Sequence, residues 1–125
     1  AQLGADIAMV LDECLGYPAT HDAARASMER TSRWAARARA RQVQLRAGAV
    51  PDVRVTNPGQ AQFGIVQGGV FPDLRAESAR RTVEIGFEGY AVGGLSVGEP
   101  SAEMYEVVGQ TTPLLPADRP RYLMG

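Results

Sequence analysis

The stretch that decides the fold is Gly89-Tyr90-Ala91-Val92-Gly93-Gly94-Leu95-Ser96-Val97-Gly98-Glu99. Within it, an apolar run from Tyr90 to Val92 ends in two glycines, and an acidic residue follows shortly after. Glycine allows a backbone to turn sharply or to approach a ligand closely. The pattern therefore predicts a buried strand whose tip offers main-chain N–H and C=O groups to a flat ligand. For a glycine pair taken alone, a tight strand-to-helix turn is the favoured interpretation.

The same arrangement occurs four times along the chain, and each copy is a short, nearly continuous apolar run. Such runs are typical of strands buried on both faces of a parallel sheet. The four runs are residues 5–11, 63–66, 90–92 and 121–124. Because ligands of parallel sheets and barrels bind at the carboxyl ends of the strands, we expect the residues at the four tips to converge on one site. These tip residues are Asp12, Gln67, Gly94 and Met124.

Helical patterns lie between the runs, which predicts an α/β fold with a parallel sheet. The helices are expected at about residues 22–46, 72–85 and 101–109. Thr20 is the expected N-cap of the first helix, and Gly86 the stop of the second. Small and apolar residues at helical spacing predict the inner face of the first helix: Ala24, Met28, Thr31, Ala35 and Ala38. Residues 49–62 contain two prolines and no clear period, so we expect a surface loop there.

The length of 125 residues allows a buried core, but a complete (β/α)8 barrel needs about 250 residues. Four strands and three helices make about half of such a barrel. The sequence begins with Ala1 rather than methionine and ends at a strand tip. We therefore expect residues 1–125 to be the central part of a single TIM-barrel domain in a longer protein.

Composition restricts the class of protein further. One cysteine excludes a disulfide framework within the chain and fits a reducing compartment. A formal net charge of −1 argues against nucleic-acid binding by bulk charge alone. Residues 22–46 nevertheless hold seven arginines against Asp22 and Glu29. A solvated outer helix face is the favoured interpretation, and a phosphate-binding strip that touches RNA is the alternative. No run is long enough to span a membrane.

Several linked motifs then carry a resemblance to a known family. They are Leu3 to Asp6, Asp12-Glu13-Cys14, Tyr17-Pro18-Ala19, Ser27 to Arg30, Gly64 to Gly68, Ile85-Gly86-Phe87, Gly89 to Leu95, Val97-Gly98-Glu99 and Arg121 to Gly125. In this order and spacing the chain resembles bacterial tRNA-guanine transglycosylase, also called queuine tRNA-ribosyltransferase. The resemblance covers nearly the whole chain, and the loop at about residues 50–62 is its clearest departure.

The resemblance implies a (β/α)8 barrel with a zinc-bearing insertion, active as a homodimer in the cytoplasm. The implied reaction exchanges guanine for preQ1, 7-aminomethyl-7-deazaguanine, at the wobble position of tRNAs with a GUN anticodon. An enzyme aspartate displaces the guanine and leaves a covalent ribosyl-enzyme intermediate. This exchange is a step of queuosine biosynthesis.

The resemblance also implies which residues read the base. Asp12 matches the carboxylate that contacts the pyrimidine edge, where guanine offers N1–H and its 2-amino group. A carboxylate only accepts hydrogen bonds and fits both of these donors. Gln67 and the backbone N–H of Gly94 match the two donors to O6.

Further positions follow from the same match. Leu95 resembles the residue whose carbonyl meets the aminomethyl ammonium of preQ1. Glu99 resembles the acid that supports the Leu95–Ser96 peptide in alternative orientations. The remaining matches are Met124 and Tyr122, which line the pocket; Cys14 and Val97, which leave less room than queuine needs; and Gly125, where a tRNA-contacting loop begins.

The resemblance places the catalytic machinery outside this chain. The nucleophilic aspartate follows residue 125, the acid/base aspartate precedes Ala1, and the zinc site needs three cysteines and a histidine. With one cysteine and one histidine, the chain builds no such metal site, and alone it is expected to be inactive. The alternative is a non-catalytic base- or tRNA-binding subunit of the same family. The presence of Asp12, Gln67 and Gly93-Gly94 favours the enzyme. A related enzyme that places preQ0 in archaeal tRNA is disfavoured by Cys14 and Val97.

Overall fold

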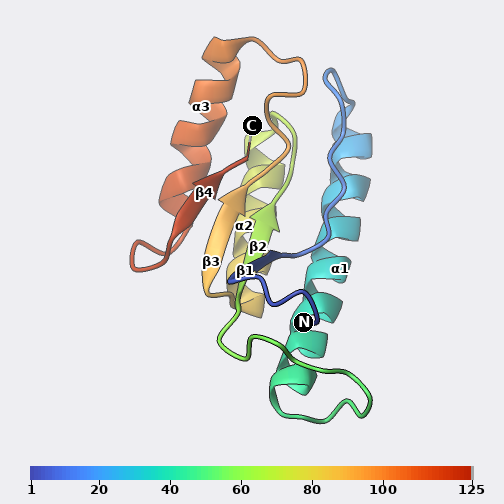
Figure 1. Cartoon of the computed structure of the whole chain (residues 1–125). Coiled ribbons are helices and arrows are strands. Elements are labelled where there is room, and N and C mark those ends of the chain that lie inside the picture. The colour runs from blue at the N-terminus through green and yellow to red at the C-terminus, as the bar shows by residue number, and fades with distance from the viewer. Residues whose placement is uncertain (125) are drawn as a thin grey trace.

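The computed structural model describes residues 1–124 as one parallel sheet with helices between its strands (Figure 1). The strands are β1 (Ile7–Met9), β2 (Ala61–Val66), β3 (Gly89–Val92) and β4 (Arg121–Leu123). The helices are α1 (His21–Arg46), α2 (Pro72–Ile85) and α3 (Ser101–Thr111), and a short 3₁₀ helix, η1 (Thr112–Leu114), follows α3. No helix within residues 1–124 combines the length and the apolar character needed to cross a bilayer.

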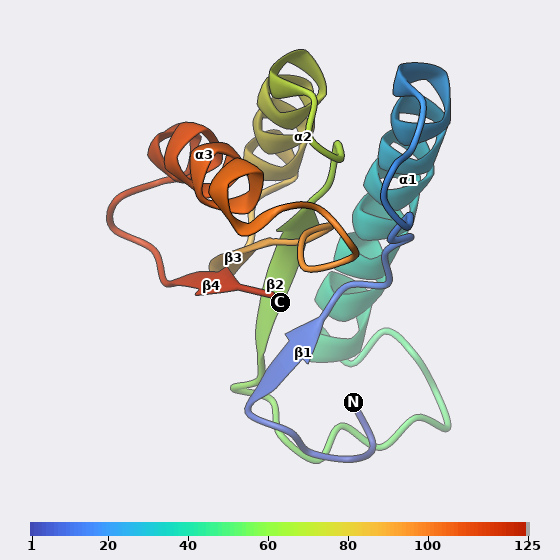
Figure 2. The ribbon, with the colours of Figure 1, turned by 90° about the horizontal axis from the view of Figure 1, so that it is seen from above.

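The strand order identifies the architecture. The strands lie side by side in chain order, β1-β2-β3-β4, and every neighbouring pair is parallel. All three helices cover the same face of the sheet, as the view from above shows (Figure 2). A doubly wound sheet would carry helices on both faces, whereas a barrel carries them on the outside only. The chain is therefore an α/β fold of four parallel strands and three helices, a partial (β/α)8 barrel, as the sequence predicts.

Local sequence explains where α1 begins and where α2 begins and ends. The Thr20 hydroxyl accepts a hydrogen bond from the Ala23 N–H at 3.2 Å and caps α1. Helix α2 has the predicted bounds, because Pro72 starts it and Gly86, with φ of 80°, ends it. The predicted inner face of α1 is confirmed: Ala24, Met28, Thr31 and Ala35 are buried, and Ala38 is partly buried against the core.

Three sequence expectations need correction. Strands β1 and β4 are not buried on both faces, because they are the edges of the sheet and most of their residues are exposed. The predicted loop 49–62 ends early, since β2 already begins at Ala61. There the Ala61 N–H donates to the Asp6 carbonyl at 2.8 Å. Helix α3 continues to Thr111 rather than Gly109 and then tightens into η1.

An ion cluster joins the amino ends of the strands to α1. Glu88, just before β3, accepts two hydrogen bonds from Arg39 and one from Arg46, each at 3.0 Å. It also accepts from the Gln62 N–H at 2.9 Å. Partial burial opposes ionisation of Glu88, but Arg39, the Gln62 N–H and Arg46 outweigh it and lower its pKa to about 2. Of the seven arginines in α1, Arg39 is half-buried and the others are exposed, as a solvated outer face requires.

Candidate functional site

Asp12 and Gln67 meet at the carboxyl ends of β1 and β2. The Gln67 side chain is only 3% exposed, and its Nε2 donates to the Asp12 Oδ2 at 2.7 Å. Its backbone N–H donates to the Ser78 hydroxyl of α2 at 3.0 Å. The backbone of Gln67 is therefore held by helix α2, and its side-chain amide is held by the Asp12 carboxylate. An acceptor-only group and an amide donor stand together at one end of the sheet.

Gly94 completes this end at the tip of β3. Its φ is +68°, and a Cβ placed on it would lie 2.3 Å from the Gln67 Oε1. Neither the backbone conformation nor the space admits a side chain without strain. The Gly93 N–H extends the β2–β3 ladder by donating to the Val66 carbonyl at 3.0 Å. The glycine pair thus brings bare main chain up against the Gln67 amide.

The loop after Gly94 is held by Glu99. The Glu99 carboxylate accepts hydrogen bonds from the Val97 N–H at 2.9 Å and from the Ser96 N–H. Partial burial acts against the charged form, yet these backbone donors keep the pKa of Glu99 below its usual range. In a trans peptide the N–H and the preceding C=O point in opposite directions. With the Ser96 N–H on Glu99, the carbonyl of the buried Leu95 points away from that carboxylate.

The loop after β1 lies against these residues. The Tyr17 N–H donates to the Val97 carbonyl at 3.1 Å, which joins the loop after β1 to the loop after β3. Cys14 is exposed. Partial burial of its sulfur and the nearby Asp12 raise the pKa of the thiol, while Arg75 and a hydrogen bond from the Gly94 backbone act in the opposite direction. The thiol is therefore the form present at neutral pH.

The structure thus brings most of the sequence-predicted residues to one end of the sheet. Met124 is partly buried beyond β4, packs against the core, and its N–H donates to the Val92 carbonyl at 3.0 Å. Tyr122 is 55% exposed on the edge strand β4. Gly125, expected to begin a tRNA-contacting loop, lies outside the described residues.

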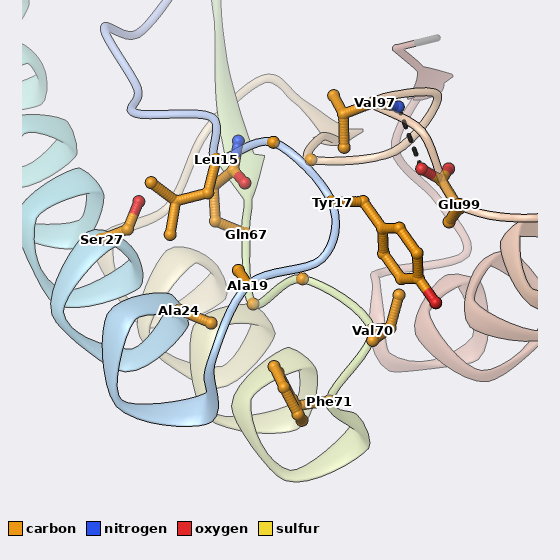
Figure 3. Close-up of a pocket in the computed structure, with 14 residues that line it drawn as sticks. Leu15, Tyr17, Ala19, Ala24, Ser27, Gln67, Val70, Phe71, Val97 and Glu99 are labelled. Carbon is orange, nitrogen blue, oxygen red and sulfur yellow. Dashed lines mark hydrogen bonds between the residues drawn. The ribbon is translucent and has the colours of Figure 1, made fainter.

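A cavity of about 430 Å³, counted with the solvent at its mouth, opens beside this group (Figure 3). Four of the predicted residues line it: Gln67, Gly94, Val97 and Glu99. The rest of its wall comes from the loops after β1 and β2 and from the first turns of α1, and includes Tyr17, Ser27, Val70 and Phe71. The sequence analysis gave these wall residues no role in the site, because their side chains meet only when three separate segments fold together.

Arg75 is the residue near the site that sequence analysis missed. It lies in α2 and is 1% exposed. Its guanidinium donates to the carbonyls of Gly69 at 2.7 Å, Val66 at 3.2 Å, Gly93 at 2.6 Å and Gly94 at 3.3 Å. Burial lowers its pKa to about 10, against the effect of Cys14 and Glu99, so the side chain remains charged at neutral pH. A sequence signal existed, because Arg75 shares the buried stripe of α2 with Ser78, Ala79 and Thr82.

The residues of this chain do not fit the zinc site of the resembled family. Such a site takes thiolate and imidazole ligands close together, and the chain has one cysteine and one histidine. Within residues 1–124 no cluster of three or more histidine, cysteine, aspartate or glutamate side chains is placed to hold a metal ion.

Comparison with known proteins defines the class. The family model for queuine tRNA-ribosyltransferase matches residues 1–125. The chain belongs to the queuine tRNA-ribosyltransferase family.

Individual curated relatives of the chain are also queuine tRNA-ribosyltransferases. The chain is 55% identical over 123 residues to a queuine tRNA-ribosyltransferase of Solidesulfovibrio magneticus. It is 55% identical to one of Actinobacillus succinogenes and 52% identical to one of Shewanella frigidimarina. Each match covers 98% of this chain and 30% of the relative. The chain thus spans about a third of the length of these curated relatives.

Proposed function

We propose that the protein containing this chain is a tRNA-guanine transglycosylase that exchanges guanine for preQ1 at the wobble position of tRNAs with a GUN anticodon. This chain supplies the pocket that recognises the base. The observation that carries the proposal is the contact between Asp12 and Gln67 beside the bare main chain of Gly94. Family membership supports a tRNA-ribosyltransferase.

The chemistry of the three groups suits guanine. Asp12 accepts from N1–H and the 2-amino group, while Gln67 and the Gly94 N–H donate to O6. A primary amide carries two N–H donors. Gln67 can therefore keep one N–H on Asp12, as in the structure, and offer the other to the base. The contact between the two side chains orients both for the same ligand.

The donors to O6 also assist departure of the base. When a carboxylate attacks the ribose carbon, the glycosidic bond breaks and guanine leaves with the bonding electron pair. Part of that negative charge resides on O6. Two fixed N–H groups aimed at O6 stabilise it more strongly than they stabilise neutral bound guanine, which lowers the barrier. The nucleophile and the acid/base aspartate belong to other segments of the protein, so this chain binds and orients the base.

The pocket wall supports preQ1 as the incoming base. With the Ser96 N–H held by Glu99, the Leu95 carbonyl is available to accept from an ammonium group. Cys14 and Val97 restrict the space around that substituent, and Met124 and Tyr122 line the base. We further propose that Gly125 begins a tRNA contact, that zinc is held elsewhere in the protein, and that the enzyme acts as a homodimer in the cytoplasm.

The test is Asp12→Asn in the full-length protein. The amide keeps the shape but presents a donor where two base donors need an acceptor. Guanine affinity is expected to fall by about 2–4 kcal/mol, because buried polar groups go unpaired. Calorimetry measures the affinity, and incorporation of preQ1 into tRNA measures the exchange.

Asp22→Asn is the matched control, because it makes the same substitution at an exposed position in the first turn of α1. Unchanged preQ1 incorporation in Asp12→Asn would remove Asp12 from its role. Wild-type protein that binds guanine without any exchange would instead favour a non-catalytic base- or tRNA-binding subunit.

A further inference from the structure

Arg75 carries a charge into the interior without an acid to balance it. Within residues 1–124, no carboxylate lies within ion-pair distance of its guanidinium. Its hydrogen bonds go only to backbone carbonyls. Burying an unpaired charge is costly, and a helix face against a sheet would be filled more stably by an apolar side chain of similar size. Packing of α2 therefore does not explain why an arginine stands here.

The carbonyls that Arg75 holds belong to the tips of two strands. Val66 ends β2, and Gly93 and Gly94 follow β3. One Nη atom bridges the carbonyls of Val66 and Gly93, and the other reaches Gly94. A planar guanidinium with five donors can bind several acceptors at once, which the point charge of a lysine cannot do with the same geometry. Arg75 thus fixes the two glycine peptides relative to β2.

This contact sets the direction of the Gly94 N–H. Gly93 C=O and Gly94 N–H belong to one trans peptide and point in opposite directions. Since the carbonyl points back to Arg75 at 2.6 Å, the N–H points away from α2. A cation on the carbonyl also polarises the peptide and makes its N–H a stronger donor.

We propose that Arg75 is a positioning residue for base recognition, which holds and polarises the Gly93–Gly94 peptide so that the Gly94 N–H binds O6 of guanine. This inference rests on the proposed function, because it assumes that guanine occupies the strand tips. Arg75 itself does not touch the base. Its effect is confined to the acceptor at position 6 of the purine.

The experiment compares guanine with 6-thioguanine, which keeps N1–H and the 2-amino group but replaces O6 by sulfur, a weaker acceptor. Affinities are measured by calorimetry on full-length wild type, Arg75→Met and Arg75→Lys. Arg39→Met is the matched control, because it removes a half-buried arginine with two hydrogen bonds at the opposite end of the strands. Melting temperatures are recorded for every variant.

We expect Arg75→Met to lower guanine affinity by about tenfold, the effect of one hydrogen bond, and 6-thioguanine affinity distinctly less. The preference for guanine over 6-thioguanine should shrink in Arg75→Met, shrink less in Arg75→Lys, and stay at the wild-type value in Arg39→Met. If Arg75→Met does not fold, Arg75→Lys carries the same comparison.

Equal loss of affinity for both bases in the Arg75 variants would overturn the inference, because a purely structural role weakens the whole pocket. The same loss of preference in Arg39→Met would overturn it as well. Wild-type protein that binds no guanine would overturn the proposed function first. Wild type that prefers guanine, with that preference intact in the Arg75 variants, would overturn this inference alone.

Discussion

At the carboxyl ends of the strands, the buried Arg75 side chain donates hydrogen bonds only to backbone carbonyls. At the amino ends, by contrast, Glu88 accepts hydrogen bonds from two arginines and a backbone N–H. The Glu88 cluster matches opposite charges and lies partly in solvent, with 30% of the Glu88 side chain exposed. Arg75 has no opposite charge within ion-pair distance among residues 1–124 and is 1% exposed.

The comparison indicates that the amino ends of the strands stabilise the fold, whereas the carboxyl ends hold the groups that we propose for base recognition. Charges at the amino ends satisfy one another and tie α1 to β2 and β3. At the carboxyl ends, Arg75 donates to backbone carbonyls, and Gln67 and Gly94 line the cavity of Figure 3. Ligands of (β/α)8 barrels bind at the carboxyl ends of the strands, and the amino ends serve stability. Substitutions at the two ends should therefore affect different measurements.

The largest effect is expected when residues 1–125 are made alone. Exchange of labelled guanine into tRNA should be absent, because the nucleophile that we propose lies in another segment of the protein. The edge strands β1 and β4 expose apolar side chains, with Ile7 at 52% and Tyr122 at 55%. Such edges promote association.

Sedimentation is therefore expected to show association of the isolated chain, and amide exchange should show weak protection in β1 and β4. The full-length protein is the control for both measurements. A monomer with a sharp two-state melt, or measurable guanine exchange, would contradict the expectation and show that this part of the barrel is more autonomous than its edges indicate.

Gly94→Ala should damage the carboxyl ends specifically. A Cβ there would lie 2.3 Å from the Gln67 Oε1 at a φ of +68°. Strain and overpacking together should cost about 2–4 kcal/mol of stability, and guanine affinity should fall because Gln67 is displaced. Denaturant unfolding and calorimetry measure the two effects.

Gly109→Ala is the matched control for this glycine. It lies in α3 with no other atom within 4 Å of the added Cβ, so alanine should stabilise the helix by about 0.5–1 kcal/mol. Guanine affinity should not change. A Gly94→Ala protein that binds guanine as tightly as wild type would show that Gln67 can move without loss of recognition.

The sequence predicts the elements of this fold well because the signals for them are local. Pro72 and Gly86 bound α2, and the apolar runs place β2 and β3 within a few residues. Local signals fail where tertiary pairing decides. Ala61 looks like loop sequence, but it pairs with Ile7 of β1 and its N–H donates to the Asp6 carbonyl, which makes it part of β2.

The candidate site likewise contains residues that local sequence predicts and one residue that it does not. Asp12, Gln67 and Gly94 are predictable because each follows an apolar run, and chain order brings strand ends together. Arg75 is not predictable by that argument, because it lies inside a helix and reaches the strand tips only through side-chain length. Its helical spacing with Ser78 and Thr82 marks a buried stripe, but does not reveal that its acceptors are backbone carbonyls of two strands.

The smallest effect is expected for Glu88→Gln, which tests the amino ends. The amide keeps the shape but loses the charge that pairs with Arg39 and Arg46. Stability at pH 7 should fall by about 1–2 kcal/mol, less than the pKa shift alone implies, because part of the side chain is solvated. Guanine affinity should not change. A fall in affinity as large as that of Asp12→Asn would show that the two ends are coupled.

The pH dependence gives the same cluster a distinctive signature. The pKa of Glu88 is about 2 in the folded protein against 4.5 for an unperturbed glutamate. A depressed pKa means that the unfolded chain takes up the proton first as the pH falls. The contribution of Glu88 is therefore complete above pH 4.5 and is lost as the pH falls from there toward about 2. Unfolding midpoints of wild type and Glu88→Gln should differ at pH 7 and converge across that range. A difference that persists unchanged at pH 2 would mean that shape, rather than charge, holds the amino ends of the strands to α1.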